Sequence, residues 1–243
     1  MLVLLPPSET KAPGGDGPPL DLDSLPFPGL TPVRRKLADA LVDLAADVPT
    51  ALRTLGLSPR QEEEVARNAA IWSARTLPAL ERYTGVLYDA LDIGGFTRTQ
   101  RAKAERRLAV ASALFGVLRG SDRIPAYRLS GGTSLPALGT LRALWRPVLE
   151  PVLAGLGELI VDLRSGAYAS LARIPGAVTV KVVTEDGRTV SHHNKAYKGR
   201  LAAALAVASR EPSTIDGLVG AAERAGIRLW RTGDTELELI TPG

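Results

Sequence analysis

Polar and basic side chains gather at five places in the sequence, each at the end of an apolar run. An arginine or lysine braced against a core can hold a phosphate or another anion. Serine, tyrosine and lysine that share a pocket can perform acid–base chemistry when burial lowers the pKa of the lysine. We predict that one anion-binding cleft is assembled from these pairs: Ser8 with Lys11, Arg119 with Asp122, Tyr127 with Arg128, Ser165 with Tyr168, and Lys195 with Lys198.

Two functions of different kinds would suit such a cleft. The first is DNA binding without chemistry, in which basic side chains contact phosphates in a sequence-tolerant and salt-sensitive way. The side chains expected to contact DNA are Arg106, Arg119, Arg128, Lys195 and Lys198. The second is catalysis on a small phosphorylated or nucleotide-like substrate, with Lys11, Tyr168 and Lys195 as the catalytic candidates. Composition leaves both functions open.

The stretch from Ser112 to Pro136 concentrates these features. Its apolar residues at 114–118 require burial, and the turns that follow keep Arg119, Arg123 and Arg128 close to them. One interpretation is a basic site braced against the core. The other is a buried helix end, a loop and a short strand whose arginines face water, as most charged residues do.

The composition is that of a globular protein with a substantial core. The chain has 243 residues, of which 45% are hydrophobic and 23% are charged, and a length that allows one large domain or two small ones. The net charge of +4 is weakly basic, so it permits a nucleic-acid or phosphorylated partner without requiring one. Basic residues concentrate at 101–128 and 192–210, which would form a positive cleft if the two segments meet.

Several classes of site are excluded by residue type. The chain contains no cysteine, so disulfides, thiolate catalysis and cysteine-held zinc or iron–sulfur clusters are ruled out. The two histidines, His192 and His193, are adjacent, and on the strand predicted there they would point to opposite faces. We therefore expect no metal site, and the absence of a Walker or GxGxxG loop gives no reason to expect a cofactor.

We expect no association with a membrane. No run of about 18 apolar residues occurs, so no spanning helix is expected. The start of the chain, MLVLLPPSETK, has a short apolar run and no basic segment before it, which is unlike a signal peptide. These features predict a cytoplasmic protein.

The elements that must position the candidate residues suggest a mixed α/β protein, with one sheet flanked by helices. Continuous apolar runs predict buried strands at Leu2–Leu5 and Glu158–Leu163, and residues 12–30 predict a long irregular loop rich in proline and glycine. A further short strand is predicted at 126–129, and hairpins pair 178–183 with 188–192 and 227–231 with 236–240. Helices are predicted at 31–46, 60–72, 97–114, 138–153, 194–208 and 212–225.

Residues 31–76 predict a helical hairpin subregion. Its centre, a helix, the turn Gly56-Leu57 and a second helix capped by Ser58, has the outline of a helix-hairpin-helix. In that motif the backbone N–H groups of the hairpin hold a phosphate. Ser58 stands where the motif usually has a second glycine, and the glutamates at 62–64 would repel a phosphate. A plain αα-hairpin is therefore the alternative.

Over nearly its whole length, apart from the loop at 12–30, the sequence resembles the YaaA peroxide-stress family of bacteria. The resemblance rests on PPSETK at 6–11, YTGVLYDAL at 83–91, LFGVLRGSDRIPAYRLSGG at 114–132, VDLRSGAY at 161–168 and KAYKG at 195–199. It implies one domain over 1–243 with the family's own α/β fold, a positive cleft and a helix-hairpin-helix. It also implies a role in the oxidative-stress response and binding of duplex or branched DNA.

The resemblance assigns residues of this chain to the cleft. It implies that the helix-hairpin-helix runs from Leu52 to Asn68. It places in or near the cleft Ser8, Lys11, Tyr88, Arg119, Tyr127, Arg128, Ser165, Tyr168, Lys195 and Lys198. The departure at Ser58 and the modest net charge both weaken the expectation of a DNA clamp.

Overall fold

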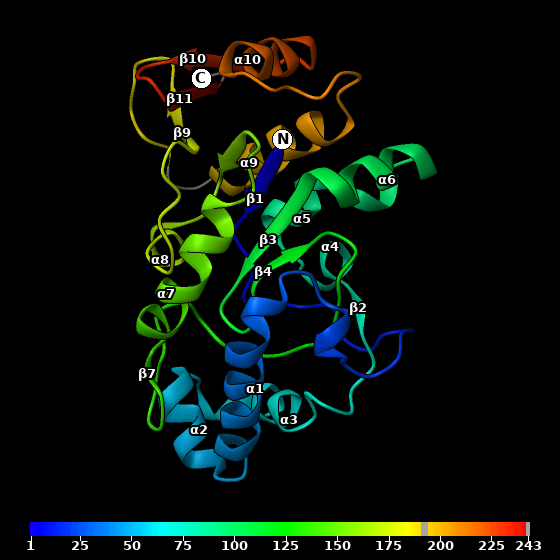
Figure 1. Cartoon of the computed structure of the whole chain (residues 1–243), viewed down its shortest axis with the longest axis vertical. Coiled ribbons are helices and arrows are strands. Elements are labelled where there is room, and N and C mark those ends of the chain that lie inside the picture. The colour runs from blue at the N-terminus through cyan, green and yellow to red at the C-terminus, as the bar shows by residue number, and fades with distance from the viewer. Residues whose placement is uncertain (191–193, 242–243) are drawn as a thin grey trace.

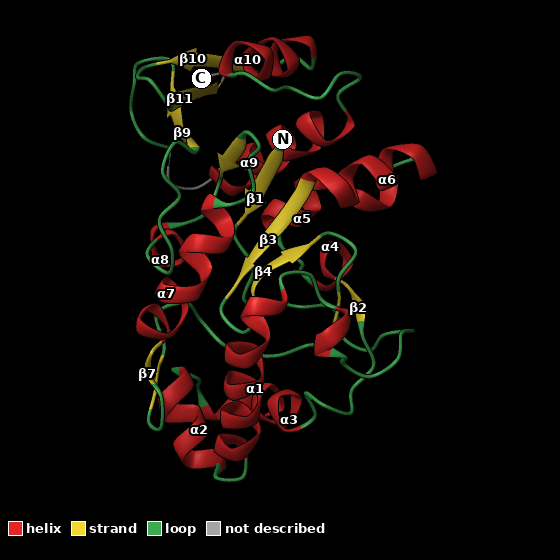
Figure 2. Ribbon diagram, viewed as in Figure 1, coloured by secondary structure: helices red, strands yellow, loops and turns green. Residues whose placement is uncertain are grey.

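The computed structural model describes residues 1–190 and 194–241, and a seven-stranded sheet forms its centre (Figures 1 and 2). The strands of this sheet are β1 (Leu2–Leu5), β3 (Leu108–Ser112), β4 (Gly116–Arg119), β8 (Ile160–Asp162), β9 (Val178–Thr184), β10 (Arg228–Arg231) and β11 (Glu236–Thr241). Their order across the sheet is β10-β11-β9-β8-β1-β3-β4. The strands from β11 to β3 run parallel, and an antiparallel strand, β10 or β4, forms each edge.

Helices and two small strand pairs surround this sheet. The α-helices of the described residues are α1 (Thr31–Ala45), α2 (Val48–Leu55), α3 (Glu62–Ala69), α4 (Ala79–Arg82), α5 (Val86–Leu91), α6 (Arg98–Arg107), α7 (Leu141–Ala154), α8 (Gly166–Ala169), α9 (Asn194–Val207) and α10 (Ile215–Arg224). The small pairs are β2 (Leu77–Pro78) with β5 (Arg123–Ile124), and β6 (Ser134–Leu135) with β7 (Gly139–Thr140). Among the described residues, no helix is long and apolar enough to cross a membrane.

The arrangement confirms the expected class, a mixed sheet flanked by helices. In Figure 1 the hairpin region α1–α3 lies at one end of the long axis, and α10 with β10 and β11 lies at the other. Strand β1 runs between β8 and β3, and all four of its side chains are buried. A continuous apolar run is what a strand needs when both faces of a parallel sheet are covered. The predicted buried strands at the start of the chain and before Leu163 are therefore confirmed.

The helix predicted at 97–114 is wrong over its second half. Helix α6 ends at Arg107, and Leu108–Ser112 forms β3, whose five residues are all buried between β1 and β4. Apolar residues at helical spacing misled the prediction, because a continuous apolar run satisfies the helical period as well as burial on both faces of a sheet. The stretch that begins at Ser112 therefore starts at a strand end, and Gly116, with φ of +74°, turns the chain into β4.

Two further predictions concern the strand at 126–129 and the hairpin that pairs 178–183 with 188–192. The residues at 126–129 form no strand, and the strand in this region is β5, two residues earlier. The predicted hairpin turns back after β9, and Thr189 forms an antiparallel bridge with Val183. Its remainder, with His192 and His193, lies outside the described residues.

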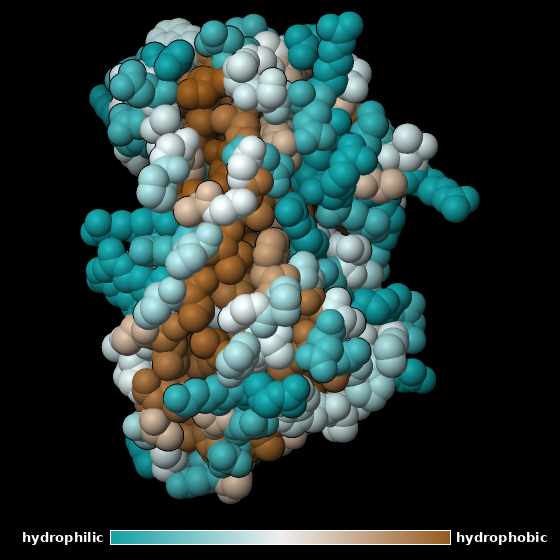
Figure 3. All heavy atoms as spheres, in the orientation of Figure 1, coloured by the Kyte–Doolittle hydropathy of each residue, from teal (hydrophilic) through white to brown (hydrophobic). Residues whose placement is uncertain are grey.

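Helix α7 closes one side of the core and gives that side an apolar surface. Trp145 is fully buried, and its indole N–H donates to the carbonyl oxygen of Ala113 at 2.8 Å. On the outer flank of the same helix, Leu144, Val148 and Val152 are only half-buried. Figure 3 shows an apolar band that runs along this face of the molecule.

The loop at 12–30 is irregular, as predicted, and it is tied to the rest of the chain. Short 3-10 turns form at Leu22–Ser24 and Pro28–Leu30. The buried guanidinium of Arg82 donates to the carbonyl oxygens of Ala12 and Gly14, the latter at 2.8 Å. These contacts fix the residues that directly follow Lys11.

Candidate functional site

The candidate site lies where the connections of the sheet diverge. From β1 the chain proceeds to β3 on one side, whereas from β8 it proceeds to β9 on the other. In open α/β sheets, ligands bind outside the carboxyl ends of strands at such a switch point. The structure puts Ser8 and Lys11 directly after β1, and Ser165 and Tyr168 directly after β8. Two of the predicted pairs therefore meet at the expected type of place.

Lys11 is the most unusual ionisable group of this edge. Its residue is only 7% exposed, and its Nζ donates to the carbonyl oxygens of Ser8 at 3.1 Å and Glu9 at 3.4 Å. The ammonium also lies 4.2 Å from the centroid of the Tyr127 ring. Burial lowers the pKa of Lys11 to about 7, although the carboxylate of Glu9 opposes this shift. Near neutral pH the amine is therefore present in both protonation states, as a general base requires.

Tyrosine side chains surround Lys11. Four of the five tyrosines of the chain are at this edge. The hydroxyls of Tyr83 and Tyr127 are 2.8 Å apart, and the Tyr127 hydroxyl is 2.7 Å from Oγ of Ser112, the last residue of β3. The ring of Tyr88 stacks on Tyr83, and its hydroxyl donates to the carbonyl oxygen of Pro6 at 2.8 Å. Burial raises the pKa of Tyr83 to about 12, so this hydroxyl remains protonated at neutral pH.

Tyr168 brings the β8 side of the edge into contact with the glycine turn at 131–132. Its hydroxyl oxygen accepts a hydrogen bond from the backbone N–H of Gly131 at 3.2 Å. A Cβ at Gly131 would come within 3.2 Å of the tyrosine ring, so a larger residue would push against the ring at this close approach. Burial raises the pKa of Tyr168, and its residue is 8% exposed. The proton that this hydroxyl retains is available to an oxygen atom of a ligand.

Arg128 is held at the site from two directions. Its guanidinium pairs with Glu9 at 3.0 Å. Its backbone N–H and C=O both bond to the side-chain amide of the buried Asn68, each at 2.8 Å. Asn68 lies in the last turn of α3, so the helical hairpin positions Arg128 through its second helix.

The amino end of α9 reaches the same edge. The side chain of Lys198 donates from Nζ to the carbonyl oxygen of Leu163 at 3.2 Å, and burial lowers its pKa although Asp162 opposes the shift. Lys195 is exposed one turn earlier on α9. Ser165 is exposed at the start of α8. Thus Lys11, Arg128, Tyr168 and the two lysines of α9 share one edge of the sheet.

Arg119 and Arg106 do not join them, so the single cleft predicted from all five pairs is wrong. Arg119 ends the antiparallel strand β4 and Arg106 precedes β3, which puts both at the amino end of the parallel strands. Five strand residues, at about 3.3 Å each, separate this edge from the Lys11 edge. Here Arg119 pairs with Glu158 at 3.6 Å, and its backbone N–H donates to Asp122 at 2.7 Å.

The helical hairpin is present, but its turn already uses its own donors. The N–H groups of Gly56 and Leu57 bond to the carbonyl oxygens of Arg53 and Leu52 at 3.3 and 2.8 Å, which is the Schellman pattern of a helix end. The N–H of Ser58 bonds to Oε1 of Gln61 at 3.0 Å. A phosphate-binding hairpin would present such N–H groups to its ligand. The geometry therefore fits a plain αα-hairpin.

Sequence reasoning missed four residues that build the site. They are Glu9, Asn68, Tyr83 and Ser112. Tyr83 and Glu9 lie within segments that carry the family resemblance, so a signal was available for them. Asn68 and Ser112 carried none, because their roles depend on distant parts of the chain. Among the described residues, no group of three or more metal-ligating side chains occurs.

Comparison with known proteins identifies the family. A family model described as "Peroxide stress protein YaaA" matches residues 1–226. The UPF0246 protein CE1889 of Corynebacterium efficiens is 51% identical over 235 residues, which cover 93% of this chain and 94% of that protein. The UPF0246 protein SCO2297 of Streptomyces coelicolor is 44% identical over 236 residues, with coverage of 93% and 90%. The chain therefore belongs to the YaaA peroxide-stress family.

Proposed function

We propose that the protein is an enzyme that acts on a small phosphorylated or nucleotide-like substrate at the Lys11 edge of the sheet. One observation carries the proposal. Lys11, nearly buried and with a pKa of about 7, lies where the connections from β1 and β8 diverge. Burying a lysine is costly, and perturbed pKa values of this kind concentrate at functional sites.

Each group at the edge has a role that its environment supports. The neutral amine of Lys11 accepts a proton from the substrate. The protonated hydroxyl of Tyr168 donates a hydrogen bond to a substrate oxygen on which negative charge develops. Arg128 and the exposed Lys195 supply positive charge for a phosphate group. Lys11 would be the catalytic base, and the arginine and lysine would orient the substrate.

Thermal denaturation with a panel of nucleotides and sugar phosphates tests this proposal. A ligand at 100 times its Kd stabilises the folded state by about 2.7 kcal/mol. For a chain of this size we expect a Tm increase on the order of 5–10 °C. Arg128→Met should abolish most of the increase, whereas Lys103→Met on α6 should retain it. The proposal fails if no phosphorylated compound raises the Tm of the wild type, or if Arg128→Met responds as the control does.

DNA binding is the second candidate, and a different observation favours it. Helix α6 packs against the carboxyl-terminal end of α9, where the guanidinium of Arg107 donates to the carbonyl oxygen of Ala206 at 3.0 Å, so the basic residues of α6 and those at 195–200 lie toward opposite ends of α9. Arg106 and Lys195 are both exposed on these helices. Their long cationic side chains could contact separate phosphates along a duplex without reading its sequence.

Binding of labelled duplex and junction DNA across a salt series tests this second candidate. The Arg106→Gln, Lys195→Gln double variant should reduce the slope of log K against log salt by about 2. A matched double variant, Arg142→Gln with Arg188→Gln, removes the same charge from exposed positions elsewhere and should leave the slope unchanged. Absence of binding in 50 mM salt, or equal slopes for both double variants, would eliminate DNA as the partner of these helices.

A further inference from the structure

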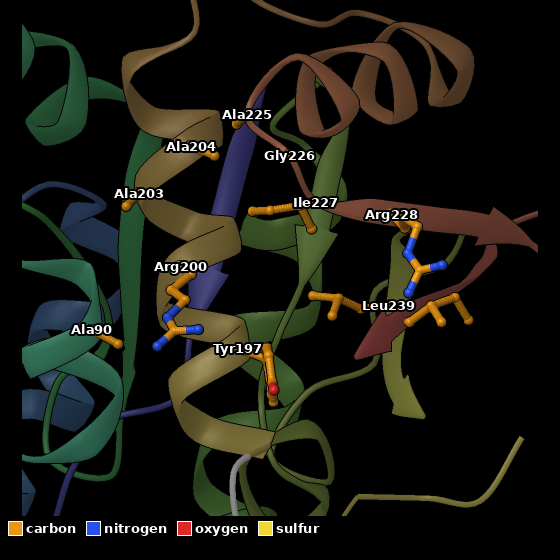
Figure 4. Close-up of a pocket in the computed structure, with 11 residues that line it drawn as sticks. Ala90, Tyr197, Arg200, Ala203, Ala204, Ala225, Gly226, Ile227, Arg228 and Leu239 are labelled. Carbon is orange, nitrogen blue, oxygen red and sulfur yellow. The ribbon is translucent and has the colours of Figure 1, made fainter. Parts of the chain in front are cut away.

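A cavity lies between α9 and the hairpin of β10 and β11, away from the Lys11 edge (Figure 4). We call it the α9–β10 pocket. Its volume is about 550 Å³, within the range of small-molecule sites. The residues that line it are Ala90, Tyr197, Arg200, Ala203, Ala204, Ala225, Gly226, Ile227, Arg228, Leu239 and Ile240. None of the side chains described at the Lys11 edge is among them.

The walls of the pocket combine small residues with apolar ones. Ala203 and Ala204 form the α9 wall, and Ala225 and Gly226 form the turn that follows α10. Because these side chains are short, they occupy little of the space between the walls, and the cavity stays open. Ile227 extends between the two walls in Figure 4. An apolar molecule inside the pocket would therefore exchange contact with water for contact with apolar walls, which is favourable.

The charged groups of the pocket are two arginines. Figure 4 shows Arg200 on α9 and Arg228 on β10 on opposite sides of the cavity. The guanidinium of Arg228 pairs with Glu185 at 2.5 Å. The guanidinium of Arg200 stacks on the ring of Tyr197, 5.6 Å from its centroid. Arg200 forms no ion pair with any residue that the structure describes. Of the two arginines of the pocket, it is therefore the one without a carboxylate partner among those residues.

We propose that the α9–β10 pocket binds an amphipathic monoanion, a molecule with one carboxylate and an apolar body. The apolar body fills the space between the alanines of α9 and Leu239. The carboxylate bonds to the guanidinium of Arg200, which presents two parallel N–H donors that match a carboxylate. The two arginines carry two positive charges, and Glu185 neutralises one of them. The positive charge that remains matches a ligand with a single negative charge. The ring of Tyr197 holds the guanidinium in place through its face.

Isothermal titration calorimetry with three probes tests the assignment. Decanoate has both features, decanol has the apolar chain without the charge, and acetate has the charge without the chain. We expect decanoate to bind at least 10-fold more tightly than either. Arg200→Gln should weaken decanoate binding at least 10-fold and leave decanol binding unchanged. Arg142→Gln, an exposed arginine on α7, should change neither.

Blocking the cavity provides an independent arm. Ala204→Trp fills the space from α9 and should abolish decanoate binding, with the far-UV circular dichroism of the wild type retained. Ala225→Leu obstructs the pocket from the exposed end of α10 and serves if the first variant unfolds. The proposal is overturned if decanoate fails to bind at 1 mM, if decanol binds equally well, or if a folded blocking variant binds decanoate as the wild type does.

Discussion

Replacement of Arg82 with methionine is expected to lower the free energy of unfolding by about 4 kcal/mol. The guanidinium is fully buried and donates to four carbonyl oxygens, of which those of Ile124, Gly14 and Arg75 are at 3.0, 2.8 and 3.1 Å. The fourth belongs to Ala12. Methionine fills much of the volume but leaves these oxygens without donors, and an unsatisfied buried acceptor costs on the order of 1–3 kcal/mol.

Urea denaturation followed by circular dichroism measures this loss. Arg98→Met, at an exposed position at the start of α6, is the matched control and should change stability by less than about 0.5 kcal/mol. A loss below about 1 kcal/mol for Arg82→Met would show that water reaches the four carbonyl oxygens. Because two of these carbonyls belong to the loop after Lys11, the variant should also expose the lysine.

Replacement of Lys11 with methionine is expected to stabilise the folded protein at pH 6, by about 2–4 kcal/mol, while it removes the proposed base. Burial lowers the pKa of this lysine from 10.5 to about 7 in the folded state. Below pH 7 the lysine is charged in both states, so the full cost of burying the charge is present. Between pH 7 and 10.5 the unfolded state binds the additional proton, and the stability of the wild type rises with pH.

The difference between the variant and the wild type should therefore depend on pH. It is largest below pH 7 and declines by up to about 1.4 kcal/mol for each pH unit above it. Urea denaturation of both proteins at pH 6, 8 and 10 measures the decline. Lys103→Met should stay within about 0.5 kcal/mol of the wild type throughout. A constant difference from pH 6 to pH 10 would mean that Lys11 does not carry a buried, titrating charge.

The helices and strands near the site were predictable where the apolar pattern of a short segment matches its burial in the structure. The run Leu2–Leu5, which is followed by two prolines, was predicted as a buried strand, and Gly56 ends the short helix that was predicted before it. The prediction failed at Leu108–Ser112, because a buried strand and a buried helix segment have the same apolar content. The strand becomes recognisable only in the assembled sheet, where it pairs with β1 on one side and β4 on the other.

The sequence suggested some residues of the candidate site, but it did not show which of them lie together. The structure brings Lys11, Tyr168, Arg128 and Lys198 to one edge of the sheet. Arg119 was assigned to the same cleft because it is close to Arg128 in sequence. The antiparallel direction of β4 carries it to the opposite edge.

The sequence by itself determined the family, the mixed α/β class and the residue types available for chemistry. Local propensity, apolar pattern and motif are properties of short segments, so they can be read without a structure. The tertiary structure decided which of these residues meet, how deeply Lys11 is buried and which carbonyls Arg82 satisfies. Those properties depend on the tertiary arrangement, which brings residues 60 positions apart into contact, as Asn68 and Arg128 show.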